Sequence, residues 1–141
     1  MPTLTDAIDA SASALAAERT RIEAAVSNLA NAESTRGPDG PYRRREVVLA
    51  ADPTNQFDAA LGRAGAVGVR VAGIVEDDSP LKQRFQPSHP DANEAGFVAL
   101  PNVNPSEEVV DMLSAARAYQ ANLAAIGLVR DLIRQSLELS R

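Results

Sequence analysis

The fold is decided by residues 104–139, whose sequence is NPSEEVVDMLSAARAYQANLAAIGLVRDLIRQSLEL. Asn104 is a good N-cap residue, Pro105 suits the first helical position, and Glu107 stands where a capping box has its glutamate. After Pro105 the chain has no further proline and a single glycine, Gly127. The stretch therefore predicts one helix of about 50 Å that begins at 105 and ends near Leu137 or Leu139.

Apolar side chains recur every seven residues in this stretch, which is typical of a helix that packs lengthwise against another helix. The first series consists of Met112, Tyr119, Ile126 and Ile133. The second series consists of Val109, Ala116, Leu123 and Leu137, and Arg130 interrupts it. A buried arginine is costly, so we expect Arg130 to find a carboxylate or to reach the solvent.

A second long helix is predicted at the N-terminus, within residues 1–32, because residues 3–32 contain no glycine and no proline. Its apolar stripe also repeats every seven residues, with Ala12 and Val26 beside it. The members of the stripe are Ile8, Leu15, Ile22 and Leu29. Two long helices at opposite ends of one chain predict a coiled-coil-like antiparallel hairpin.

The middle of the chain, residues 33–104, is predicted to be a small β unit. Residues 33–105 hold seven of the eight glycines and eight of the nine prolines, which favours turns and short strands. We expect strands at 42–50, 67–75, 84–86 and 97–100, with a bulge at Gly73. Residues 52–66 are expected to form a flexible loop. The predicted fold class is α+β, with the β-rich unit inserted between the terminal helices.

Composition excludes several classes of function. The 141-residue chain has a net charge of −5, no cysteine and one histidine, His89. An acidic chain is a poor candidate for sequence-independent binding to nucleic acid. Without cysteine there is neither a disulfide nor a thiolate zinc site. No phosphate loop or nucleophile motif is present, so we expect no catalytic residue, no cofactor, no small-molecule substrate and no enzyme.

One segment resembles the start of a calcium loop. Asp91, Asn93 and Gly96 have the spacing of loop positions 1, 3 and 6, but Asn102 stands where the bidentate carboxylate belongs. We therefore interpret residues 91–96 as a turn and expect no metal site.

The 26 alanines also bear on function. Many of them lie partly off the apolar stripes of both predicted helices, where small side chains allow close approach by a further helix. We therefore expect the helices to contact other subunits as well as each other. The main alternative is a soluble coiled-coil adaptor or export chaperone that clasps one partner.

Two segments carry a resemblance to a known family. The first is SNLANA at 27–32 with GPDGPY at 37–42, and the second is PNVN at 101–104 with RAYQAN at 117–122. Together they resemble the bacterial flagellar rod and hook family. The length of the chain and the segments GVRV at 68–71 and EDDSP at 76–80 resemble its proximal rod members.

The resemblance implies a structural subunit of the periplasm-spanning basal-body rod, which self-associates through its terminal helices into a helical tube that transmits torque. Its implied partners are copies of itself, other proximal and distal rod proteins, the adaptor at the rod base and the flagellar type III export apparatus. Export by that route needs no cleaved signal peptide. This fits an N-terminus that has neither the basic segment nor the apolar segment of a secretory signal peptide. The stripes and family motifs predict an assembly interface of Ile8, Leu15, Ile22, Asn28, Leu29, Asn31, Met112, Ala116, Arg117, Tyr119, Asn122, Leu123, Ile126 and Ile133.

Overall fold

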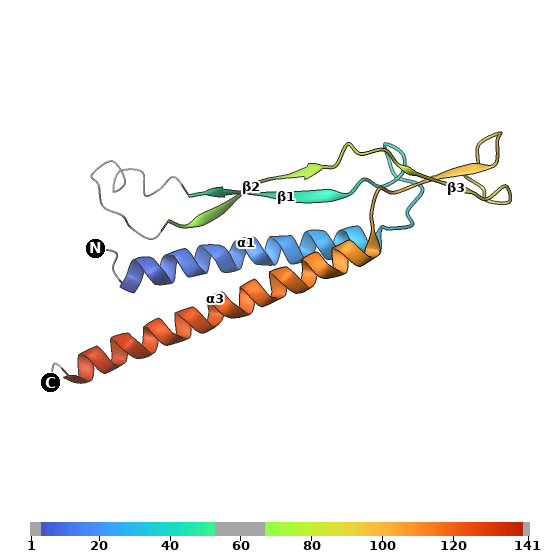
Figure 1. The fold of residues 1–141 in the computed structure, drawn as a ribbon. Coiled ribbons are helices and arrows are strands. Elements are labelled where there is room, and N and C mark those ends of the chain that lie inside the picture. Colours follow the sequence, from blue (N-terminus) through green and yellow to red (C-terminus); the bar gives the residue numbers. More distant parts are fainter. Residues whose placement is uncertain (1–3, 53–66, 140–141) are drawn as a thin grey trace.

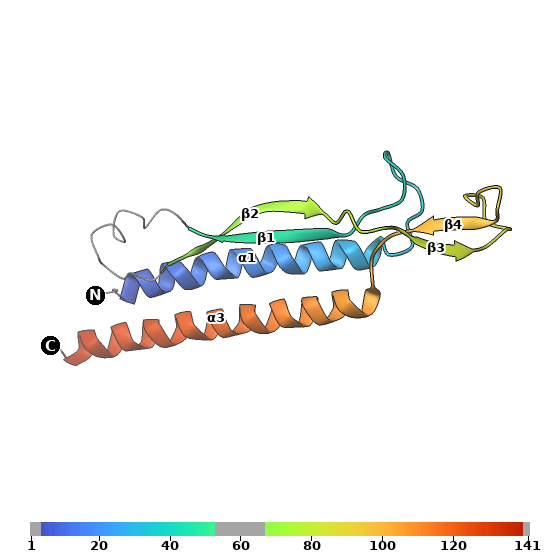
Figure 2. The same ribbon diagram turned by 45° about the horizontal axis from the view of Figure 1, so that its top comes forward.

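The structure, a computed structural model, describes residues 4–52 and 67–139. The two long helices are α1, Leu4–Ala30, and α3, Pro105–Leu139. They lie side by side and antiparallel in both views (Figures 1 and 2). This confirms an α+β fold with one long helix at each end of the chain. By the rise of 1.5 Å per residue, α3 is about 12 Å longer than α1.

The start of α3 is capped as its sequence predicts. The Asn104 side-chain oxygen accepts a hydrogen bond from the Ser106 amide at 3.2 Å, and its carbonyl accepts one from the Glu108 amide at 3.1 Å. The Asn104 amide group also donates to Glu107 at 2.8 Å. The Asn104 side chain therefore satisfies the Ser106 amide, which lacks a partner inside the helix.

The middle of the chain forms two separate hairpins. Strand β1, Arg45–Ala51, pairs antiparallel with β2, Val69–Glu76. Strand β3, Lys82–Phe85, pairs antiparallel with β4, Phe97–Leu100. The register of β1 and β2 shifts between Val48 and Leu49, where Val48 faces Gly73, so the bulge expected near Gly73 is present. The loop expected at 52–66 lies outside the described residues, apart from Asp52.

The β1–β2 ribbon lies along α1, on the side away from α3 (Figures 1 and 2). A hydrogen bond joins the ribbon to the first half of α1, because the Val69 amide donates to the Ser13 hydroxyl at 3.0 Å. Gly68 leaves room for this contact, since a Cβ atom there would lie 3.0 Å from the same hydroxyl oxygen and Ser13 would have to shift by a few tenths of an ångström. The molecule is therefore layered as α3, α1 and ribbon.

The buried apolar core is made of small side chains. Its members are Ala17, Ala25, Val98, Val103 and Ala115. Alanines on both helices let their backbones approach closely, but they remove little apolar surface from water. Much of the large apolar surface of the chain is consequently left exposed, including Leu128 and Leu139 on α3.

The β3–β4 hairpin, with its connecting loop at 86–96, projects beyond the ends of both helices (Figure 2). We call residues 82–100 the arm. Its loop is closed by Asn93, whose side-chain oxygen accepts hydrogen bonds from the amides of Ala95 and Phe97. Asp91 ties the loop to the chain after α1, since it accepts a hydrogen bond from Thr35 at 2.8 Å and pairs with Arg36.

Candidate assembly interface

The face of α3 that contacts α1 contains the first of the two predicted series. Met112, Tyr119, Ile126 and Ile133 are all half-buried. Their neighbours on this face are Glu108, Ala115, Asn122 and Val129, of which Glu108 and Ala115 are buried and the other two half-buried. Among the described elements, α3 contacts only α1. The face is thus a seven-residue stripe in which small and polar side chains alternate with large ones.

The second predicted series lies outside this contact. Ala116 is half-buried, but Leu123 is 55% exposed, Leu137 is 64% exposed and Val109 is 36% exposed. Arg130 is exposed as well, so its charge needs no buried partner. The residues that alternate with the first series against α1 therefore stand one position before the predicted second series: Glu108, Ala115 and Asn122 each precede one of its members, and Val129 precedes Arg130.

A third row of apolar side chains on α3 points away from α1. At 100° per residue these positions fall on the side of the helix opposite to Ala115 and Ile126. The row consists of Val110 (64% exposed), Leu113 (50%), Leu128 (64%), Leu132 (45%) and Leu139 (89%). We call it the outer row. An extended line of exposed leucines and valines on one helix face marks a contact surface.

Some of the interface residues predicted on α1 are covered by the rest of the chain, and others are exposed. Ile8, Leu15 and Ile22 are half-buried, whereas Leu29 is 37% exposed. Asn28 is 1% exposed and therefore inside the chain.

Besides Asn28, the family motifs added three polar residues to the predicted interface: Asn31, Arg117 and Asn122. Asn31 donates to the Ser27 carbonyl and accepts from the Ser34 hydroxyl. On α3, Asn122 donates to the Ala118 carbonyl, and Arg117 is exposed.

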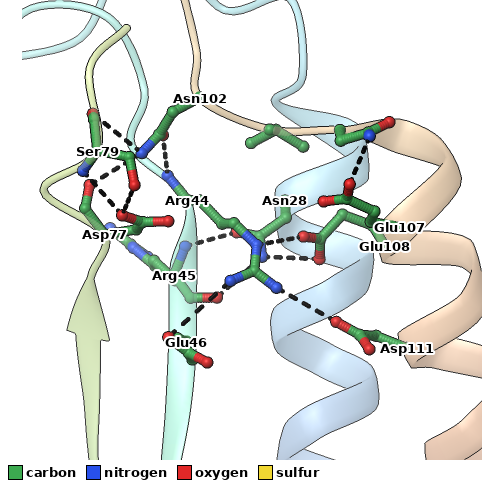
Figure 3. Close-up of polar contacts among 12 residues, drawn as sticks. Asn28, Arg44, Arg45, Glu46, Asp77, Ser79, Asn102, Glu107, Glu108 and Asp111 are labelled. Atoms are coloured by element: carbon green, nitrogen blue, oxygen red, sulfur yellow. Dashed lines mark hydrogen bonds and ion pairs between the residues drawn. The ribbon is translucent and has the colours of Figure 1, made fainter.

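Asn28 belongs to a polar cluster that joins α1, α3 and the start of β1 (Figure 3). We call Asn28, Arg44, Glu108 and Asp111 the clasp. Arg44 Nε lies 2.6 Å from Glu108 Oε1, and Arg44 Nη2 lies 3.2 Å from Asp111 Oδ2. Glu108 is only 2% exposed, so its charge is stabilised by Arg44 rather than by water.

The Asn28 side chain uses its full hydrogen-bonding capacity. Its amide nitrogen donates to the Arg45 carbonyl and to Glu108 Oε2, both at 2.9 Å. Its oxygen accepts from the Arg45 amide at 2.8 Å and from the Tyr42 hydroxyl at 2.9 Å. Only an amide side chain has two donors and two acceptors in this arrangement, which explains an asparagine among the alanines of α1.

A second asparagine extends the network to the end of β2. Asn102 accepts a hydrogen bond from the Arg44 amide at 2.8 Å and donates to the Asp77 carbonyl at 2.9 Å. Among the described residues, no buried side-chain nitrogen or oxygen lacks a hydrogen-bond partner. The clasp and its extension therefore hold both hairpins and both helices in one orientation.

Three groups in and around this network have shifted pKa values. The hydrogen bond that Arg44 donates to Glu108 raises the pKa of Arg44 above its ordinary value. Hydrogen bonds from Ser79 lower the pKa of Asp77, and the Thr35 hydroxyl, followed by Arg36, lowers the pKa of Asp91. All three shifts favour the charged forms, as in a structural ion-pair network.

The clasp was missed as a unit by the sequence analysis. Asn28 and Glu108 are separated by 80 positions, and the run Arg43–Arg45 gives no sign of which arginine turns inward. The one available signal was a glutamate in the first turn of α3 followed by an aspartate three residues later. Those residues also occur at ordinary exposed helix starts, because carboxylates are favoured there.

The described residues contain no group of three histidine, aspartate or glutamate side chains placed to hold a metal ion. Asp91 and Asn93 instead form the turn contacts of the arm. His89 Nδ1 accepts a hydrogen bond from the Asp91 amide at 3.1 Å, which is a structural role. No helix within residues 4–52 and 67–139 has the length and apolar character needed to cross a bilayer.

Comparison with known proteins agrees with the resemblance found in the sequence. Residues 94–139 match the family described as flagellar basal body rod FlgEFG protein C-terminal. The flagellar basal-body rod protein FlgC of Salmonella typhimurium is 42% identical over 139 residues, which cover 98% of each chain. FlgC of Borreliella burgdorferi is 39% identical over 151 residues, covering 96% of this chain and 97% of the relative.

A third relative extends the comparison to another group of bacteria. FlgC of Bacillus subtilis is 39% identical over 145 residues, covering 95% of this chain and 96% of the relative. Identity at this level over nearly the full length, shared by three such relatives, does not favour the adaptor or chaperone alternative. The chain therefore belongs to the FlgC family of flagellar basal-body rod proteins and is a structural component of the flagellar basal body, not an enzyme.

Proposed function

We propose that this chain builds part of a helical, torque-transmitting tube by packing its terminal helices against copies of itself and against other proximal and distal rod proteins. The observation that carries the proposal is the outer row of α3, whose leucines and valines are left exposed although α3 already contacts α1. A subunit that worked alone would gain stability by covering such a surface.

The shape of the molecule supports a tube. Contacts between unlike surfaces that do not close into a ring generate a helical assembly. Helices longer than about 40 Å, packed side by side along one axis, resist bending and twisting of that assembly. The ribbon and the arm lie to one side and beyond the ends of the helices, where they could lock neighbouring subunits laterally (Figure 1).

The same arrangement suggests separate roles for the helices and for the middle unit. We assign assembly to the helical parts within 1–32 and 105–141 and lateral locking to the middle unit at 33–104. Within the assembly, the outer row, Leu123 and Leu29 are among the exposed side chains available for coiled-coil-like contacts with neighbours. Ile8, Leu15, Ile22, Met112, Tyr119, Ile126 and Ile133 act indirectly, because they keep α1 and α3 together.

The partners implied by family membership include the adaptor at the rod base and the flagellar type III export apparatus, which delivers the chain to the periplasm-spanning rod. Helices gain most of their stability from packing. Because the apolar packing between α1 and α3 is weak, the helix ends of the free subunit are partly unfolded before assembly. These helix ends become ordered when the subunit packs into the rod.

Leu123→Asp tests the proposal, because it places a charge on an exposed α3 position without disturbing the contact with α1. We expect cells that carry this variant as their only copy to lose motility, and the purified variant to remain soluble with an unchanged circular dichroism spectrum. Leu123→Met is the matched control and keeps motility. Motile cells with Leu123→Asp in their basal bodies would contradict the proposal.

A further inference from the structure

Strand β3 is the exposed strand of the arm. All of its residues, Lys82–Phe85, are exposed, whereas Val98 of β4 is fully buried and the two residues after it are half-buried. In Figure 2 the loop at 86–96 curls beside β4, and β3 lies at the open side of the hairpin. The two strands of the arm therefore differ in what surrounds them.

The outer backbone groups of β3 have no partner in the described chain. The Gln86 amide donates to the Gly96 carbonyl at 2.9 Å, which identifies the even-numbered residues of the hairpin as those that bond across it. The amide and carbonyl groups of Gln83 and Phe85 therefore point outward, and no residue within 4–52 or 67–139 bonds to them. An edge of this kind is a template for a further strand.

The outer edge of β4 is closed by the loop of the arm. Phe97 donates its amide to the Asn93 side-chain oxygen and accepts a hydrogen bond from the Asn93 amide, both at 2.9 Å. The loop thus occupies the place that an added strand would take beside β4. Within the arm, the β3 edge alone is left to accept one.

The usual protection of an edge strand is incomplete at β3. Natural edges are often guarded by lysine side chains or by proline. Lys82 does not guard this one, because its ammonium donates to the Val103 carbonyl at 2.6 Å. Pro80 and Pro87 stand outside β3 and leave its outward donors in place. Between them they leave room for a partner segment of about six residues.

The two faces of the arm differ in chemistry. Phe85 and Phe97 share one face, are 63% and 41% exposed, and meet edge to face with ring centroids 5.3 Å apart. Arg84 lies on the opposite face, and neither strand of the arm carries a carboxylate. In a strand added beside β3, apolar residues would therefore be favoured next to Phe85 and an acidic residue next to Arg84.

We propose that the β3 edge binds an extended segment of a different protein of the basal body, in which an acidic residue stands between two apolar residues. Main-chain hydrogen bonds to Gln83 and Phe85 give the affinity, and the side chains of Phe85 and Arg84 give the specificity. Strands β1 to β4 of this chain have no carboxylate between two apolar residues, so the strands of a second copy do not match. The inference rests on the proposed rod function and names the chemistry of a lateral partner.

Hydrogen exchange tests the added strand directly, because it follows single amide groups. In the purified chain the amides of Gln83 and Phe85 should exchange rapidly, whereas the Gln86 amide is protected by its bond inside the hairpin. In isolated basal bodies we expect exchange of the two outward amides to slow about a hundredfold, with Gln86 as the internal reference. Fast exchange of both in basal bodies that contain the chain overturns the inference and leaves the rod function standing. Absence of the chain from basal bodies contradicts the proposed function itself.

Proline gives a matched pair of variants. Gln83→Pro removes an outward donor and no bond inside the hairpin, so it should reduce the protection of the Phe85 amide in basal bodies about tenfold. Ala99→Pro places the same ring on the directly opposite residue of β4 and should leave that protection unchanged, as should Gln83→Ala, which keeps the amide. Exclusion of the Gln83→Pro chain alone from basal bodies also supports the inference. Equal behaviour of the two proline variants overturns it.

Photo-cross-linking identifies what lies beside β3. A benzophenone amino acid in place of Gln83 is activated in isolated basal bodies, and the linked peptide is sequenced. We expect a segment of another basal-body protein with an acidic residue between two apolar ones, and about tenfold less product when the chain also carries Arg84→Glu. A segment without this pattern, a second copy of this chain, no product, or a yield that Arg84→Glu leaves unchanged overturns the inference.

Discussion

Arg44 and Glu108 form an ion pair of 2.6 Å between the start of β1 and the first turn of α3, with the carboxylate buried and the guanidinium about one-fifth exposed. Asn28 of α1 donates to the other oxygen of the same carboxylate. The orientation of α1, α3 and the ribbon therefore depends on one buried charge at the end of the molecule where α3 begins.

Glu108→Gln should destabilise the chain by about 2–3 kcal/mol, because it removes the charge that Arg44 pairs with in a buried position. A glutamine amide group also turns a donor either toward Asn28 Nδ2 or toward Arg44 Nε, both of which are donors. Urea unfolding of the purified variant measures the loss.

The neighbouring Glu107→Gln is the control for this prediction. Glu107 is exposed and accepts a hydrogen bond from Asn104, which a glutamine also accepts. Its free energy of unfolding should change by less than about 0.5 kcal/mol. Equal losses in the two variants would show that Glu108 has no special role.

The link between the arm and the chain after α1 should depend on pH. The pKa of Asp91 is lowered, first by the Thr35 hydroxyl and then by Arg36. A carboxyl whose folded pKa lies below its unfolded value contributes stability that is present above the ordinary aspartate pKa and is lost as the pH falls through the folded value. Carbon NMR titration of the Asp91 carboxyl measures this pKa.

Thr35→Val should raise the Asp91 pKa toward its ordinary value, because the strongest hydrogen bond to the charged form disappears. Thr20→Val on α1 is the control, since Thr20 donates only to the Ala16 carbonyl. An Asp91 titration that is the same in both variants would contradict the assigned cause.

Gly96→Ala should loosen the arm. The position has φ of +80°, and the added Cβ atom would lie 2.9 Å from the Phe85 ring, so we expect a local cost of about 1–3 kcal/mol. Hydrogen exchange at the Gln86 amide, which donates to the Gly96 carbonyl at 2.9 Å, reports on it. The same amide should be unaffected in Gly73→Ala, where the new Cβ atom meets nothing within 4 Å.

Hydrogen exchange along α3 should be graded in the purified chain before assembly. The first turns are held by the clasp and by Ala115, whereas the last turns carry mostly exposed side chains. Amides near 108–116 should therefore exchange slowly and those near 130–138 rapidly, by a factor of about one hundred if the packing differs by roughly 3 kcal/mol. Uniform protection along α3 would contradict this prediction and the proposal that the free subunit is loose at its ends.

Local signals in the sequence predicted much of the fold because they act over a few residues. Asn104 and Pro105 fix the start of α3, and the apolar run at 97–100 becomes β4 with the same bounds. The strand expected at 42–50 begins later, at Arg45, because Arg44 and its amide are engaged by Glu108 and Asn102.

The rotation of α3 against α1 was not predictable from periodicity alone. Ala115, Asn122 and Val129 repeat every seven residues, and so do Ala116 and Leu123, with Leu137 two repeats further on. Choosing the larger side chains favours the second set, but α1 supplies Ala17 and Ala25 to the contact, and small residues on both sides allow closer packing. The partner helix decides between the two sets, and the sequence of α3 contains no information about it.

Leu4 and Leu139, the outermost residues of the two helices, lie at one end of the molecule, and the clasp lies at the other (Figure 1). Force that separates the helices at the open end would break their contacts one turn after another, with the clasp last. Force along the axis would load every contact at the same time. The two helices are therefore easy to separate from the open end and hard to slide past each other, which suits a structural component of the flagellar basal body.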